Sequence, residues 1–128
     1  MIVDSSALIA ILLKEPEALR FTTAIAKSSV CRLPSPNFLE TSMLLLGRLG
    51  EDGLRDLDHY ISRSKMEIAP FTESQARLAR DAFKRFGKGR HPARLNLGDC
   101  FSYAAAKALN APLLYVGGDF AKTDIRAA

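Results

Sequence analysis

The stretch Met1-Ile2-Val3-Asp4-Ser5-Ser6-Ala7-Leu8 contains the two kinds of element from which the fold is built. Its first three residues form a short β-prone run that ends at an aspartate. Ser5-Ser6 then opens an apolar helical pattern over Ala7–Lys14. The order strand, acidic residue and helix therefore appears within the first fourteen residues.

The same alternation continues along the chain. Further strand-like runs are predicted at Val30–Leu33, Met66–Ala69 and Leu113–Val116. Further helical patterns run over 17–27, Pro36–Gly50, Leu54–Ser64, 73–86 with Thr72 as cap, and Asn96–Ala108. Strands that alternate with helices predict an α/β fold, a three-layer sandwich in which helices flank a central, mostly parallel sheet.

Size and composition fit one domain over residues 1–128 with a core of its own. A hydrophobic content of 48% and a charged content of 25% are ordinary for a soluble globular protein. Cys31 and Cys100 match no metal-ligand spacing; a reduced, cytoplasmic chain fits them best, although they could form one disulfide. The apolar run Ala7–Leu13 is too short for a membrane span or a signal peptide, so no membrane partner is expected.

The net charge of +4 is unevenly distributed. Residues 1–76 carry 8 Lys or Arg against 10 Asp or Glu, whereas residues 77–128 carry 10 against 4. Most of the excess lies between Arg77 and Arg94, where Asp81 is the only acidic residue. Such a basic stripe suits a protein that holds a polyanion by its backbone, although a solvated helix face is the more common explanation.

Four carboxylates stand in otherwise apolar segments, each near the expected start of a helix: Asp4, Glu40, Asp99 and Asp119. Asp4 and Asp119 directly follow strands, and ligands of parallel sheets bind beyond the carboxyl ends of the strands. Converging carboxylates would repel one another unless a cation lay between them, and a divalent metal is the usual solution. The pattern therefore predicts an acidic metal site, of a kind suited to phosphodiester chemistry.

Each carboxylate also has a purely structural explanation. Asp4 could be only a helix N-cap, Asp99 could form a capping pair with Asn96, and Asp119 could be a turn residue after two glycines. Glu40 favours function, since a charged residue on so apolar a helix is seldom buried without a partner. Asp124 could be a fifth member, but a solvated charge in the tail is the commoner outcome.

Four segments resemble the PIN-domain ribonucleases over nearly the full length of the chain. They are Met1-Ile2-Val3-Asp4-Ser5-Ser6-Ala7-Leu8, Asn37-Phe38-Leu39-Glu40-Thr41, Leu97-Gly98-Asp99-Cys100-Phe101-Ser102-Tyr103-Ala104 and Gly118-Asp119-Phe120. The stretch from Gly87 to Cys100 is especially similar to the VapC toxins of bacterial toxin–antitoxin pairs.

The resemblance implies an endoribonuclease dependent on Mg²⁺ or Mn²⁺ that cleaves structured cellular RNA and arrests growth. Asp4, Glu40, Asp99 and Asp119 match the acidic quartet of the family, and Ser6 matches its supporting hydroxyl. Ser5 stands where the family often has threonine, a conservative change. The resemblance also implies a VapB-type antitoxin and a toxin homodimer, and the apolar helix Pro36–Gly50 could serve as a dimer interface.

In the mechanism implied, Asp4 and Asp99 bind the metal directly, and Glu40 and Asp119 complete the site directly or through water. The candidates for contact with RNA phosphates lie in the loop before the sixth helix; they are Lys88, Arg90, His91 and Arg94.

Other classes fit less well. A phospho-acceptor signalling domain would need an acidic pair at the first strand, and an aspartyl-phosphate phosphatase would need a second aspartate where Ser6 stands. A non-catalytic RNA-binding or scaffold protein on the same fold remains as the alternative, and nuclease activity lost in EDTA would separate the two.

Overall fold

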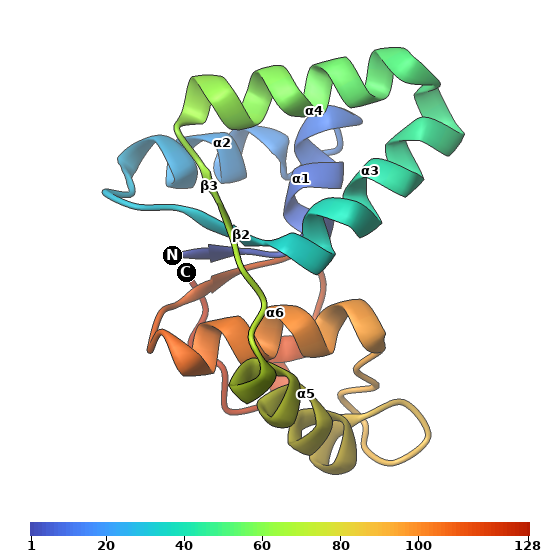
Figure 1. Cartoon of the computed structure of the whole chain (residues 1–128), viewed down its shortest axis with the longest axis vertical. Helices are drawn as coiled ribbons and strands as arrows, with labels where there is room; N and C mark the ends of the chain where they lie inside the picture. The colour runs from blue at the N-terminus through green and yellow to red at the C-terminus, as the bar shows by residue number, and fades with distance from the viewer.

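A computed structural model describes all of residues 1–128, and it shows a parallel sheet between two layers of helices (Figure 1). The strands are β1 (Ile2–Val3), β2 (Arg32–Pro34), β3 (Glu67–Ala69) and β4 (Leu113–Leu114). The helices are α1 (Ser5–Leu12), α2 (Ala18–Lys27), α3 (Ser35–Leu49), α4 (Glu51–Ser64), α5 (Glu73–Phe86) and α6 (Leu97–Ala108), followed by the 3₁₀ helix η1 (Phe120–Lys122). The expected α/β sandwich is confirmed, and its sheet is entirely parallel.

The strand order is β3-β2-β1-β4, so the first strand of the chain lies inside the sheet beside the last. Ile2 is aligned with Leu113 and Val3 with Leu114. Because successive side chains of a strand point to opposite faces, these two pairs pack in two separate hydrophobic cores. Ile2 and Leu113 pack under α5 and α6, whereas Val3 and Leu114 pack under α1 to α4, as the lower and upper layers of Figure 1 show.

The two cysteines follow the same division. Cys100 belongs to the core under α5 and α6, and Cys31 to the core on the other face of the sheet. Both are buried and free, so the disulfide considered above does not form.

Several boundaries differ from the prediction. Helix α4 begins at Glu51 instead of Leu54, because Gly50, with φ of 67°, already turns the chain. Gly53 lies within the first turn, where an added Cβ would come within 2.7 Å of the Leu45 carbonyl oxygen. The glycine therefore allows α4 to approach α3 closely and does not interrupt the helix. Strand β2 starts at Arg32, two residues later than expected.

The loop from Gly87 to Leu95 is partly buried. Its ends are joined by hydrogen bonds from Lys88 N to Leu95 O at 2.9 Å and from Leu95 N to Phe86 O at 3.0 Å. Ala93 and Leu95 are fully buried, so the loop is anchored in the core at its end and exposes its basic side chains.

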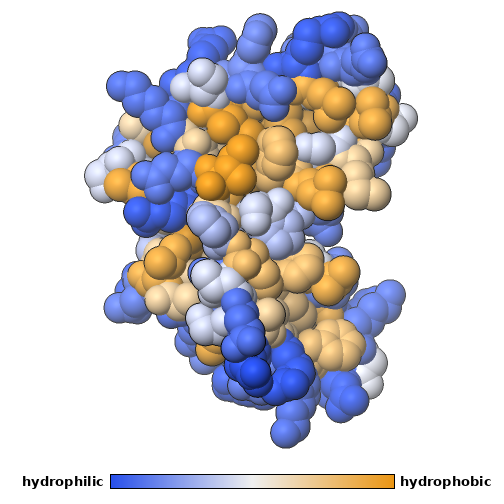
Figure 2. Space-filling model, in the orientation of Figure 1, coloured by the Kyte–Doolittle hydropathy of each residue, from blue (hydrophilic) through white to orange (hydrophobic).

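Helix α3 retains an exposed apolar stripe that burial within one chain does not explain. Its members recur at three- or four-residue intervals; they are Leu39, Met43, Leu46 and Leu49. Figure 2 shows apolar surface in the upper right part of the molecule, where α3 and α4 lie. None of the helices is long and apolar enough to cross a lipid bilayer.

Candidate active site

Three of the four predicted acidic residues line one open hollow at the carboxyl edge of the sheet. Asp4 follows β1, Glu40 lies in the second turn of α3, and Asp99 lies in the first turn of α6. The β1 arrow in Figure 1 points toward this edge, and the outline in Figure 2 is indented there between the two helical layers. Parallel topology thus brings together residues up to 95 positions apart.

Asp4 is held from both sides. It is only 4% exposed, and its Oδ2 accepts hydrogen bonds from the Ser6 amide at 3.0 Å and the Ser6 hydroxyl at 2.6 Å. Its Oδ1 accepts a short hydrogen bond from the Ser102 hydroxyl. Ser6 Oγ in turn accepts from the Val116 amide at 3.0 Å. Asp4 therefore is the N-cap of α1, as one explanation predicted, and its carboxylate is also fixed toward the hollow.

Asp99 forms the capping box anticipated with Asn96, in which each side chain accepts from the backbone N–H of the other at 2.9 Å. Burial raises the pKa of Asp99 to about 6; the backbone hydrogen bond from Asn96 opposes the rise, and the negative charges of Asp4, Asp119 and Glu40 add to it. The capping role is therefore real, and the negative charges of the other three carboxylates also act on Asp99.

Glu40 is exposed, so the argument for its function from burial on an apolar helix does not apply. Its carboxylate lies against Gly98 of α6, and an added Cβ at Gly98 would overlap both carboxylate oxygens. No Lys, Arg or His forms an ion pair with Glu40 or with the other three acidic residues. The site therefore carries uncompensated negative charge.

Asp119 lies just before η1, is exposed, and makes no side-chain capping bond. It does not line the hollow, but its charge reaches Asp99. No three acidic, His or Cys side chains are arranged as a ready-made ligand set for one ion. The donors nevertheless fit a hard divalent cation that keeps several water ligands and takes few from the protein.

The four predicted RNA-contact residues divide into two groups. Lys88, Arg90 and Arg94 are exposed and form no ion pairs. His91 instead shapes the loop: its Nδ1 accepts from the Ala93 amide at 3.0 Å, and its ring packs edge-on against Phe86.

Asp124 belongs to a different cluster. It accepts from the Tyr103 hydroxyl at 2.7 Å, and its other oxygen lies 2.8 Å from Lys107 Nζ. Burial alone would raise the pKa of Asp124, but hydrogen bonds from Lys107 and Tyr103 outweigh it and lower the pKa. Asp124 thus ties the C-terminal segment to α6 and does not line the acidic hollow.

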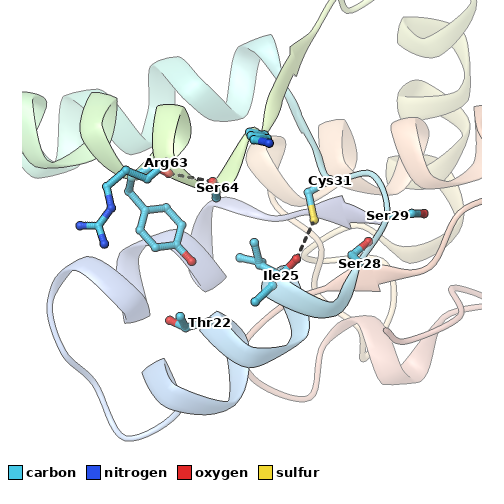
Figure 3. Close-up of a pocket in the computed structure, with 10 residues that line it drawn as sticks. Thr22, Ile25, Ser28, Ser29, Cys31, Arg63 and Ser64 are labelled. Atoms are coloured by element: carbon cyan, nitrogen blue, oxygen red, sulfur yellow. Dashed lines mark hydrogen bonds between the residues drawn. The ribbon is translucent and has the colours of Figure 1, made fainter.

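A second hollow lies between the C-terminal parts of α2 and α4 (Figure 3). It is lined by hydroxyl groups, by Arg63 and Lys65, and by Cys31, whose thiol donates to the Ile25 carbonyl at 3.8 Å. No carboxylate lines it. This second hollow therefore lacks the acidic donors found at the carboxyl edge.

Sequence reasoning missed two buried polar residues that connect the acidic helices. Ser102 follows Asp99 by three residues and bonds to Asp4, and Asn37 precedes Glu40 by three residues. The Asn37 amide donates at 3.1 Å both to Ser5 Oγ and to Gly98 O. The available signal was the helical spacing, since residues three apart share a face.

Comparison with known proteins agrees with this geometry. The PIN-domain family model matches residues 1–126. Ribonuclease VapC30 of Mycobacterium tuberculosis is 43% identical over 125 residues, which cover 98% of this chain and 95% of the relative. Ribonuclease VapC of Mycolicibacterium smegmatis is 44% identical over 127 residues, which cover 99% and 98%.

The chain belongs to the PIN-domain family, among the VapC ribonucleases. The resemblance inferred from the sequence is confirmed. Two solved structures share the fold of this VapC-family chain. VapC20 of M. tuberculosis, described as a sarcin–ricin loop cleaving toxin, has a TM-score of 0.80 at 17% identity and covers 99% of this chain and 97% of its own. VapBC2 of Rickettsia felis, bound to a promoter DNA fragment, has a TM-score of 0.76 at 15% identity, with 99% and 96% covered.

Proposed function

We propose that this VapC-family chain is a metal-dependent endoribonuclease that acts as the toxin of a VapBC-type pair. The observation that carries the proposal is the convergence of acidic residues with no cationic partner. Burial raises the pKa of Asp99 to about 6, and the negative charges of the other three carboxylates add to the rise. Repulsion among neighbouring carboxylates does not stabilise a protein, whereas a binding site for a divalent cation needs carboxylates placed close together.

Asp4 and Asp99 would hold Mg²⁺ or Mn²⁺ directly, with Glu40 and Asp119 acting as further ligands or through water. The bound ion would lower the pKa of a coordinated water for attack on phosphorus and stabilise the leaving oxygen. Ser6 orients Asp4 through its hydroxyl, as the distances above support. Lys88, Arg90 and Arg94 would contact RNA phosphates and fix the strand without reading its sequence.

The partners follow from the relatives. A VapB-type antitoxin would neutralise the toxin, and the VapBC2 complex of R. felis supports this expectation. The exposed apolar stripe of α3 offers area for a homodimer or for the antitoxin. Free, buried cysteines fit a cytoplasmic protein.

The test is cleavage of total cellular RNA by purified protein, refolded from denaturant so that no antitoxin remains bound. Discrete fragments should form in Mn²⁺ or Mg²⁺ and disappear in EDTA and with Asp99→Asn, which keeps the shape of the side chain and removes its charge. Equal cleavage by Asp99→Asn, or in EDTA, would contradict the proposed site. Intact RNA in every lane, with RNA still bound, would favour a non-catalytic RNA-binding protein.

A further inference from the structure

We propose that Ser102 is a positioning residue that fixes the Asp4 carboxylate relative to Asp99. This inference rests on the proposed function. Ser102 is fully buried in α6, and its hydroxyl donates to Asp4 Oδ1. Asp99 lies three residues earlier on the same helix and therefore on the same face. One hydrogen bond thus sets the distance between two acidic residues that are 95 positions apart in sequence.

The environment of Asp4 shows why this bond controls orientation. Strand β1 before Asp4 and helix α1 after it fix the backbone, but rotation about the side-chain bonds could still turn the carboxylate. Ser6 holds Oδ2 from α1, and Ser102 holds Oδ1 from α6. With the Ser102 hydroxyl removed, Oδ1 would lose its donor and the carboxylate could turn about its contact with Ser6.

The behaviour of other helical hydroxyls supports a specific role. A serine or threonine within a helix often donates to the carbonyl four residues earlier. Four hydroxyls in this chain do so, at distances of 2.7 to 2.8 Å: Thr23, Thr41, Ser42 and Ser64. Ser102 does not.

The carbonyl that Ser102 would reach in that way belongs to Gly98, and it accepts from the Asn37 amide at 3.1 Å. This carbonyl thus already has a side-chain donor, and the Ser102 hydroxyl donates to Asp4 instead.

The experiment measures Mn²⁺ binding to the metal-free full-length chain, by electron paramagnetic resonance of the unbound ion, beside RNA cleavage and urea unfolding. The variants are Ser102→Ala and Ser102→Cys, which retains volume but donates weakly. Ser64→Ala is the matched control, because it removes a helical hydroxyl that bonds only to backbone carbonyls. Groups that orient metal ligands typically change metal affinity by 10–100-fold when removed, so Mn²⁺ affinity of both Ser102 variants should fall about tenfold or more.

Cleavage by both variants should fall in parallel and recover partly at high Mn²⁺, while Ser64→Ala should match the wild type. Reduced stability with unchanged Mn²⁺ affinity would show a merely structural role and overturn the inference, as would wild-type behaviour of both variants. The proposed function is tested separately, by the wild-type protein. A folded wild-type chain that neither binds Mn²⁺ nor cuts RNA would overturn the proposed function and, with it, the role of Ser102.

Discussion

The Glu40 carboxylate occupies the space that a side chain at position 98 would fill, so Gly98 and Glu40 can be neighbours only because residue 98 has no Cβ. Gly98 is buried in the first turn of α6, immediately before Asp99. The position of the Glu40 carboxylate against α6 depends on this contact.

Gly98→Ala should therefore inactivate the protein without changing any acidic residue. The added methyl group meets the end of a flexible, exposed side chain, so Glu40 would swing away and the fold would survive. We expect RNA cleavage to fall at least tenfold, as a small misplacement in an active site can cost about 100-fold.

Gly47→Ala is the matched control, since nothing lies within 4 Å of its new Cβ. It should keep full activity and gain about 0.5–1 kcal/mol in unfolding free energy. Full activity of Gly98→Ala would disprove a role for Glu40 at its observed position.

Asp99→Asn should stabilise the metal-free protein, and the gain should depend on pH. The folded-state pKa of Asp99, about 6, lies above its ordinary value of 3.8, so the folded wild type holds its proton more tightly than the unfolded chain. Wild-type stability relative to the variant should fall as pH rises from about 4 to about 6, by up to about 3 kcal/mol, and stay level above that. Urea unfolding in EDTA at pH 4 and pH 7 measures this difference. A constant difference between the two proteins would show that folding does not raise the pKa of Asp99.

Charge removal in the loop from Gly87 to Leu95 should weaken RNA binding at all sequences alike. We expect the double variant Lys88→Ala/Arg90→Ala to bind RNA with a weaker salt dependence. RNA binding is measured with both proteins carrying Asp99→Asn, so that the RNA is not cleaved. The magnitude of the slope of log affinity against log salt should fall by about 1.4, or about 0.7 for each lost phosphate contact. Lys27→Ala/Arg63→Ala removes the same charge from exposed positions in the last turns of α2 and α4. An equal change in both double variants would mean that only net charge matters.

Asp124→Asn should leave RNA cleavage unchanged, because Asp124 pairs with Lys107 and Tyr103 and does not line the acidic hollow. The variant should lose stability by about 0.2–1 kcal/mol, the usual range for an exposed pair. That loss should diminish at acidic pH, since a carboxylate with a lowered pKa stabilises the folded state only while it is ionised. Cleavage rates at saturating metal, with Asp119→Asn as the inactive comparison, provide the check; loss of activity would make Asp124 a fifth member of the site.

The sequence predicts those features that depend on local pattern. Strand-like runs, helix caps such as Thr72 with Gln75, and the positions of Asp4 after a strand and of Asp99 in a first turn all follow from rules that act within a few residues. The parallel arrangement then follows from the alternation of strands and helices.

Features that depend on contacts between distant segments could not be predicted in this way. The sequence places the start of α4 after Gly53, because no local pattern shows that this glycine fits against Leu45 of α3. The bond between Ser102 and Asp4 joins residues 98 positions apart, and a serine in an alanine-rich helix has no local mark of such a partner. Exposure of Glu40 likewise depends on how α3 is placed against α6.

The position of β1 between β2 and β4 has a consequence for synthesis on the ribosome. Asp4 and β1 are synthesised before β4, the hydroxyl at position 102 and the carboxylates at 99 and 119. At a translation rate of about 5–20 residues per second, several seconds pass between the synthesis of Asp4 and that of Asp119. Under the proposed function, a nascent chain could not cleave RNA before α6 and Asp119 had been made, and a truncated product that lacks α6 would be inactive.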